Sequence, residues 1–188
     1  MDNIDSMFGR VKITLRRDKR DINYRQSIKE FMQTVRESDF VLMIISDSYL
    51  KSVNCMYEML EFIKDTNYKE RILPLIMNDT KLFNPLGRLE YIKYWQQQEK
   101  ELRDQLQYID GLNAIDLYRD LKKIEETSRN IGEFLAVISD MNNLIIEENI
   151  KEKDFDTILK VIGAYPTNDN VTEFIPKQDA VKKNSLDC

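Results

Sequence analysis

Three side chains that could do chemistry stand at regular spacing in the segment SVNCMYEML: Ser52, Cys55 and Glu58. They follow closely on the strand-like run FVLMIIS. The chain has no histidine and only two cysteines. Nucleophile–histidine pairs and most zinc sites are therefore excluded. Any chemistry here must use carboxylates, hydroxyls, amides, lysine or arginine.

Glu58 has two interpretations. Helical periodicity places it opposite an apolar stripe formed by Met56, Met59, Leu60 and Ile63. On the residues alone, a solvated glutamate near a helix start, favoured by the helix dipole, is the better interpretation. The alternative is that Glu58 is the one catalytic carboxylate of the chain.

The neighbouring polar residues also have alternatives. A thiol at a helix N-terminus can be nucleophilic, but no base is at hand, so a packing role is favoured for Cys55. Ser52 is expected to cap the helix, with Asn54 as the other candidate cap. Ser46 and Asp47 directly follow a predicted strand. They either bind the ribose or phosphate of a ligand or stabilise the turn through their side chains, and the sequence favours neither alternative.

Composition narrows the class of protein. The net charge of −5 and the lack of a basic stripe argue against nucleic acid as the main partner. No apolar run approaches the ~18–20 residues that cross a bilayer, and the N-terminus does not resemble a signal peptide, so a cytoplasmic location is expected. With five glycines and no GxxxxGK[ST] or GxGxxG motif, a phosphate-binding loop is not expected. We therefore expect no metal and no cofactor.

Local patterns predict the elements that must position these residues. Short apolar runs predict strands over Val11–Leu15, Phe40–Ile45 and Arg71–Met77. The second run is continuously apolar, which is typical of a strand buried on both faces, and Pro74 predicts that one side of the third lacks a full ladder. A polar loop is expected over Arg16–Tyr24.

Helices are expected between and after these strands. One is capped by Ser27, and another follows the polar turn SDSYLKSVN and ends near Asp65. The segment RLEYIKYW suits either a short strand or a helix start. QQQEKELRDQL is helical, LYRDLKKIEETSRNIGEFLAVISDMNNLI forms one or two helices, and KDFDTILKVIGA forms another. Tyr91 and Trp95 are expected in the core.

Strands that alternate with helices predict an α/β fold with a parallel sheet. Ligands of such sheets bind beyond the carboxyl ends of the strands, which places the first candidate site between the loops Arg16–Tyr24 and Ser46–Asn54. One domain is expected over residues 1–165, followed by a disordered tail or linker over residues 166–188.

The segment RRDKRDINYRQSIKEFMQTVRESDFVLMIISDSYLKSVNCMYEMLEFI, followed by RILPLIM and YIKYW, resembles a bacterial Toll/interleukin receptor (TIR) domain. The resemblance covers roughly Val11 to Gly163 and implies a flavodoxin-like TIR fold whose BB loop spans about Arg16–Ser27. A complete TIR domain begins with a strand similar to FISY and a helix. Only ten residues precede Val11, so the first strand and helix are expected to be absent and the domain to be N-terminally incomplete.

The resemblance implies an NAD+ hydrolase that cleaves the nicotinamide–ribose bond, with a role in bacterial defence or signalling. In the family the catalytic glutamate is the last residue of SxxCxxE, which is Glu58 here. NAD+ is then substrate rather than cofactor, and self-association through TIR–TIR contacts is implied. The residues expected to bind the substrate are Ser46, Asp47, Tyr49, Ser52, Asn54, Cys55, Asp18 and Tyr24.

Two other functions are compatible with the resemblance. One is a non-catalytic adaptor that self-associates through the BB-loop region, where Asp21 and Tyr24 lie. The other is a sensor that binds a signal similar to ADP-ribose without cleaving it. Release of nicotinamide by the purified protein would separate the enzyme from both.

Overall fold

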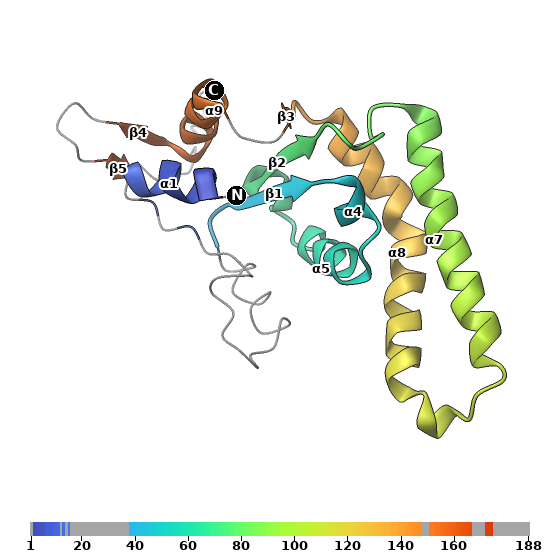
Figure 1. Ribbon diagram of the computed structural model, residues 1–188. Coiled ribbons are helices and arrows are strands. Elements are labelled where there is room, and N and C mark those ends of the chain that lie inside the picture. The colour runs from blue at the N-terminus through green and yellow to red at the C-terminus, as the bar shows by residue number, and fades with distance from the viewer. Residues whose placement is uncertain are drawn as a thin grey trace, which may run out of the picture. The chain divides into compact units, whose positions relative to one another are not determined.

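The computed structural model describes residues 2–11, 13, 15, 38–147, 151–166 and 172–174 (Figure 1). The chain forms two compact units. The smaller contains Met1–Arg17 and Asn149–Cys188, and the larger contains Asp18–Glu148. The segment 16–37, which holds the predicted BB loop and the helix capped by Ser27, lies outside the described residues.

The larger unit is built on a parallel sheet with the strand order β1-β2-β3. Its strands are β1 (Val41–Ile45), β2 (Ile72–Met77) and β3 (Leu144–Ile146). The parallel sheet flanked by helices confirms the predicted α/β fold, and β1 and β2 match two of the predicted strands to within one residue. β3 is a correction, because it lies in a segment predicted as helix.

Pro74 sits where the ladder of β2 is incomplete. On one side β2 pairs with β1 from Ile72 to Ile76. On the other side β3 pairs only with the three residues from Leu75 to Met77. Proline has no amide hydrogen to donate, and the prediction that one side of this strand lacks a full ladder is confirmed.

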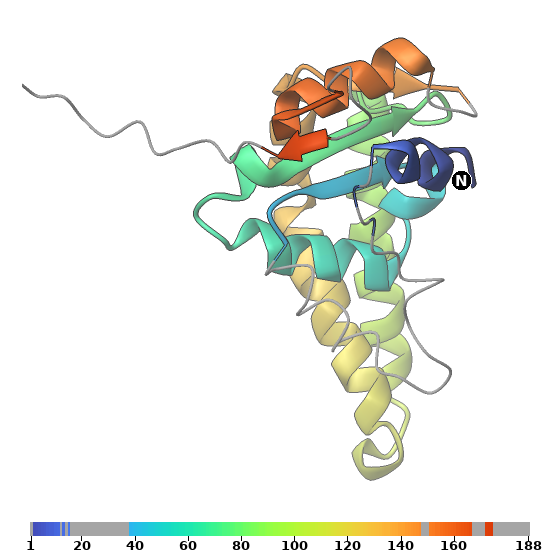
Figure 2. The same ribbon diagram turned by 90° about the vertical axis from the view of Figure 1, so that its left-hand side faces the viewer.

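Helices connect the strands of the larger unit. After β1 come α4 (Asp47–Leu50), α5 (Val53–Ile63) and α6 (Tyr68–Arg71). After β2 come α7 (Pro85–Leu106), the short 3-10 helix η1 (Gly111–Asn113) and α8 (Ile115–Asp140). Figures 1 and 2 show α7 and α8 side by side as a long hairpin whose tip lies far from the strands.

The segment RLEYIKYW, for which strand and helix were both possible, belongs to α7. The helix starts where its side chains favour it: the Asn84 side chain accepts a hydrogen bond from the amide of Leu86 at 2.9 Å, and Pro85 occupies the first helical position. The predicted QQQEKELRDQL helix is the continuation of α7, so this prediction is confirmed.

The core of the larger unit lies between the sheet, α5 and the hairpin. Tyr91 and Trp95 are buried there, which confirms the prediction. Three residues of the predicted α5 stripe are also buried: Met56, Met59 and Leu60. Phe62 is buried as well, whereas Ile63 is only partly buried. The apolar surface of α5 is broader than one stripe because the helix packs against α8 as well as beneath the sheet.

The smaller unit contains α1 (Asp2–Arg10), α9 (Glu152–Ile162), β4 (Ala164–Pro166) and β5 (Thr172–Phe174). The rings of Phe8 and Phe155 meet edge to face with centroids 5.1 Å apart. α9 confirms the predicted final helix and ends at Gly163, whose φ of 74° is the left-handed conformation that glycine adopts most easily.

β5 pairs antiparallel with β4. Four residues of the segment 166–188, expected as a disordered tail, are therefore in strands, which is a correction for Pro166 and Thr172–Phe174. Most of that segment lies outside the described residues.

The strand predicted over Val11–Leu15 is wrong for the residues described there. Val11 lies in a turn and Ile13 and Leu15 are not in a strand, and the amides of Val11 and Ile13 both donate to the carbonyl oxygen of Phe8 at 3.1 Å. The physical reason is a helical pattern. The buried residues Ile4, Met7, Phe8 and Val11 fall at spacing i, i+3, i+4, i+7, so Val11 ends a helical stripe rather than starting a strand.

Candidate functional site

Polar residues gather at the carboxyl ends of β1 and β2, as expected for a parallel sheet. Ser46 directly follows β1 and caps α4, because its Oγ accepts a hydrogen bond from the amide of Tyr49 at 3.1 Å. The segment predicted as a polar turn therefore contains one turn of helix, which is a correction. The reason is this cap: a serine hydroxyl satisfies an amide at the helix start.

Asp47 makes several hydrogen bonds at this edge. Its carboxylate accepts hydrogen bonds from the Lys51 ammonium at 2.8 Å and from the Tyr91 hydroxyl at 3.0 Å. Its amide donates to the Asp79 carboxylate at 3.2 Å, which ties the end of β1 to the loop after β2. The Lys51 ammonium, helped by the Tyr91 hydroxyl, lowers the pKa of the Asp47 carboxyl, so this group is ionised at neutral pH.

Three aromatic residues on one face of α7 hold the chain segment that carries α4. Besides Tyr91, the Trp95 indole donates to the carbonyl oxygen of Leu50 at 2.9 Å, and the Tyr94 hydroxyl donates to that of Lys51 at 3.3 Å. We call Tyr91, Tyr94 and Trp95 the aromatic clamp.

Sequence reasoning placed two members of the aromatic clamp in the core but missed its hydrogen bonds. The spacing i, i+3, i+4 of three aromatics with polar atoms was the available signal. Burial raises the pKa of Tyr91 to about 12, and the hydrogen bond to Asp47 acts in the same direction. Its hydroxyl therefore stays protonated and remains a donor.

α5 begins as predicted at Ser52, whose Oγ accepts a hydrogen bond from the amide of Cys55 at 3.4 Å. Asn54, the other candidate cap, lies in the first turn, where its exposed side-chain oxygen is 3.5 Å from the Lys123 ammonium of α8. The Cys55 thiol is free and half-buried.

Glu58 is half-buried on α5, not fully exposed. It lies close enough to Tyr49 to influence the pKa of the Tyr49 phenol. The pKa of Tyr49 lies well above its ordinary value, first because the phenol is buried and then because an ionised phenol would be repelled by Cys55 and Glu58. The structure thus brings Tyr49, Cys55 and Glu58 into one electrostatic neighbourhood beside the carboxyl edge of the sheet. Asp18 and Tyr24 lie outside the described residues.

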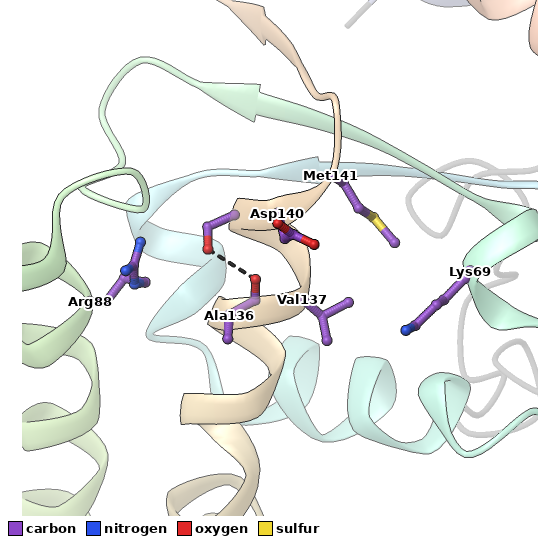
Figure 3. A pocket seen from close by; sticks show the side chains of 7 residues that line it. Lys69, Arg88, Ala136, Val137, Asp140 and Met141 are labelled. Atoms are coloured by element: carbon purple, nitrogen blue, oxygen red, sulfur yellow. Dashed lines mark hydrogen bonds between the residues drawn. The ribbon is translucent and has the colours of Figure 1, made fainter.

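An open cavity of about 570 Å³ lies elsewhere in the larger unit, around the last turns of α8 (Figure 3). We call it the α8 groove. No residue predicted from the sequence lines it. The residues that do are Lys69, Arg88, Ala136, Val137, Ser139, Asp140 and Met141.

The described part of the chain shows neither a metal-binding cluster nor a membrane-spanning helix. There, His, Cys, Asp and Glu do not form a group of three or more that could hold a metal ion. None of the described helices combines the length and apolar character needed to span a bilayer.

Comparison with known proteins gives one match. The family model for the TIR domain matches residues 3–107, which is more than half of the chain and ends at the C-terminus of α7. No curated protein and no solved structure matches.

Proposed function

This chain belongs to the TIR domain family, and from that premise we propose that it hydrolyses the nicotinamide–ribose bond of NAD+ with Glu58 as the catalytic carboxylate. The observation that supports this proposal most is the half-buried position of Glu58 on α5, the helix that follows α4 after the carboxyl end of β1.

The reaction suits a site without histidine. NAD+ and water give ADP-ribose, nicotinamide and a proton. Nicotinamide leaves from a cationic pyridinium, so it departs neutral and needs no acid to protonate it, unlike the oxygen leaving group of ordinary glycosides. The remaining demand is to stabilise the positive charge that develops on the ribose, and a fixed carboxylate in a partly desolvated site does this.

Neighbouring residues can donate hydrogen bonds and hold this region in place. Tyr49 is protonated at neutral pH, as an ordinary tyrosine is, and its raised pKa keeps it a hydrogen-bond donor. Ser52 and the aromatic clamp fix both ends of the segment that leads into α5, which is where a catalytic group needs rigid support. We propose that this reaction serves bacterial defence or signalling in the cytoplasm.

The test is release of nicotinamide from NAD+ by the purified protein and by Glu58→Gln, which removes the charge and keeps the shape. We expect the rate to fall about 10²–10³-fold, the usual effect of removing one electrostatic group from a transition state. The matched control is Glu61→Gln on the same helix, where the carboxylate pairs with Lys64, and its rate should stay within about twofold of the wild type.

Two results would contradict the proposal. One is an unchanged rate in a folded Glu58→Gln protein. The other is no release by the unmodified chain at concentrations where it self-associates.

The second candidate function is a non-catalytic module that acts by self-association, as TIR domains commonly do. It is favoured by the exposed apolar side chains at the tip of the α7–α8 hairpin, among them Tyr108, which is 85% exposed. This candidate predicts association without nicotinamide release, so the two measurements together separate it from the hydrolase.

A further inference from the structure

The tip of the α7–α8 hairpin exposes a group of apolar side chains. Surface patches of this kind mark interaction sites, and tyrosine is enriched in protein interfaces. We define the hairpin tip as residues 107–118. Its exposed large side chains are Tyr108, Ile109, Ile115, Leu117 and Tyr118.

The hairpin tip is also acidic. Within residues 107–118 the charged side chains are Asp110 and Asp116, and Arg119 is the first basic residue after them. Arg119 pairs with Asp116 at 2.7 Å. The tip therefore presents apolar side chains within a field of net negative charge, and the surface that fits it is apolar with positive charge.

The α8 groove has that character. Its apolar part consists of Ala136, Val137 and Met141. Lys69 and Arg88 approach it from opposite sides of α8 (Figure 3), and the Arg88 guanidinium is held by a hydrogen bond to the carbonyl oxygen of Leu82 at 3.0 Å.

The same groove contains one acidic side chain, from Asp140, so two cations face one anion. Its volume of about 570 Å³ lies within the range of pockets that hold small ligands. There is room for a tyrosyl ring and a neighbouring aliphatic side chain.

The two surfaces lie at opposite ends of the hairpin. α7 has 22 residues and is therefore about 33 Å long at a rise of 1.5 Å per residue. Arg88 lies in the first turns of α7 and lines the groove at the C-terminal end of α8. The tip lies beyond the last turn of α7. A patch that fits a different patch on an identical molecule gives a heterologous, head-to-tail contact.

We propose that the hairpin tip of one copy docks into the α8 groove of a second copy, so that the chains associate head to tail. Like charges oppose a symmetric tip-to-tip contact, whereas tip and groove carry opposite net charge. The inference deepens the proposal of self-association and does not depend on hydrolysis. Raising the salt concentration should weaken the association, because the charges lie at an exposed rim.

Two variants test the contact, each disabling one surface. The tip variant is Tyr108→Ser with Ile109→Ser, and the groove variant is Lys69→Glu with Val137→Ser. All four residues are exposed or half-buried, so both proteins should fold, which circular dichroism checks. The control is Leu86→Ser, which removes a side chain that is 70% exposed on the same hairpin but belongs to neither surface.

Sedimentation velocity then measures the size of the assemblies. The unmodified chain and Leu86→Ser should form species larger than dimers as concentration rises. Each surface variant alone should need at least tenfold higher concentration to associate. An equimolar mixture of the two should form dimers and nothing larger, because one intact tip meets one intact groove.

Three results would overturn the proposal: a monomeric wild type at every concentration, weaker association in only one of the two surface variants, or a mixture that stays monomeric. If only one variant is impaired, the tip and the groove are not partners of each other. Nicotinamide release, measured on the same samples, reports separately on the hydrolase proposal, so failure of either proposal leaves the other standing.

Discussion

The hydroxyl of Tyr91 joins the end of β1 to α7, and removing it should destabilise the larger unit measurably. Tyr91→Phe keeps the buried ring and deletes the donor to the Asp47 carboxylate, together with the acceptor that lies 3.3 Å from the amide of Lys81. Hydrogen bonds to a charged group contribute about 1.5–3 kcal/mol. The Asp47 side chain is 32% exposed, so water replaces part of the loss, and we expect about 1.5 kcal/mol.

Tyr94→Phe is the matched control one turn later on α7. It makes the same chemical change, but the lost hydrogen bond to the Lys51 carbonyl oxygen is longer, at 3.3 Å, and exposed. Water can replace it, so the cost should be no more than about 0.5 kcal/mol. The difference between the two variants isolates the bond to Asp47 from the general effect of losing a phenol.

Urea unfolding followed by tryptophan fluorescence measures both changes. Trp95 is the only tryptophan of the chain and is fully buried on the same helix, so its emission reports on the larger unit alone. With a urea dependence of about 2 kcal/mol per molar, Tyr91→Phe should lower the midpoint by about 0.7 M. Equal midpoints for Tyr91→Phe and Tyr94→Phe at pH 7 would refute the reasoning.

The effect should also depend on pH. The pKa of Asp47 is lowered in the folded state, first by Lys51 and in part by Tyr91. A lowered carboxyl pKa stabilises the fold above the unfolded pKa of about 3.9, and this contribution disappears as the pH falls through the folded value. The difference in free energy of unfolding between wild type and Tyr91→Phe should therefore have its full value at pH 7 and decrease below about pH 4.

Three further substitutions should change the free energy of unfolding, two lowering it and one raising it, and the same urea titration measures all three. Ser52→Ala removes the cap of α5 and should cost about 1 kcal/mol; a cost below about 0.3 kcal/mol would mean that the cap contributes little. Gly87→Ala should cost about 1–3 kcal/mol, because a β-carbon there would clash with the backbone and side chain of Lys81. Gly132→Ala should instead stabilise by about 0.5–1 kcal/mol, because it lies inside α8 and the nearest atom to a new β-carbon is Ile92 Cδ1 at an ordinary 3.6 Å. An unchanged midpoint for both glycine variants would contradict the packing described for the hairpin.

Elements with strong local signals could be predicted from the sequence. β1 and β2 are continuous apolar runs, and α5 starts at Ser52 because a serine hydroxyl can satisfy an early helix amide. These signals act within a few residues of the chain and do not depend on distant contacts. The same holds for Glu58, whose position on α5 follows from the cap and the helical period.

Other features depend on contacts that no local pattern contains. β3 is only three residues long and starts four positions after the end of a 26-residue helix. It is a strand because Leu144 pairs with Leu75. The β-branched run at Val11 predicts a strand, whereas the helical spacing that begins at Ile4 determines the structure. The hydrogen bonds of the aromatic clamp likewise exist only once α7 lies against the segment after β1.

The long hairpin between β2 and β3 has a consequence for the order of folding. Leu75 and Leu144 pair although they are about 70 positions apart in the chain. If α7 and α8 pack against each other first through their local contacts, which takes microseconds, fewer than about twenty flexible residues remain in the loop between β2 and β3. The entropic cost of closing this loop then falls by about 1 kcal/mol, because that cost grows with the logarithm of loop length. The last strand should then join the sheet late, delivered by a rigid hairpin that has already formed.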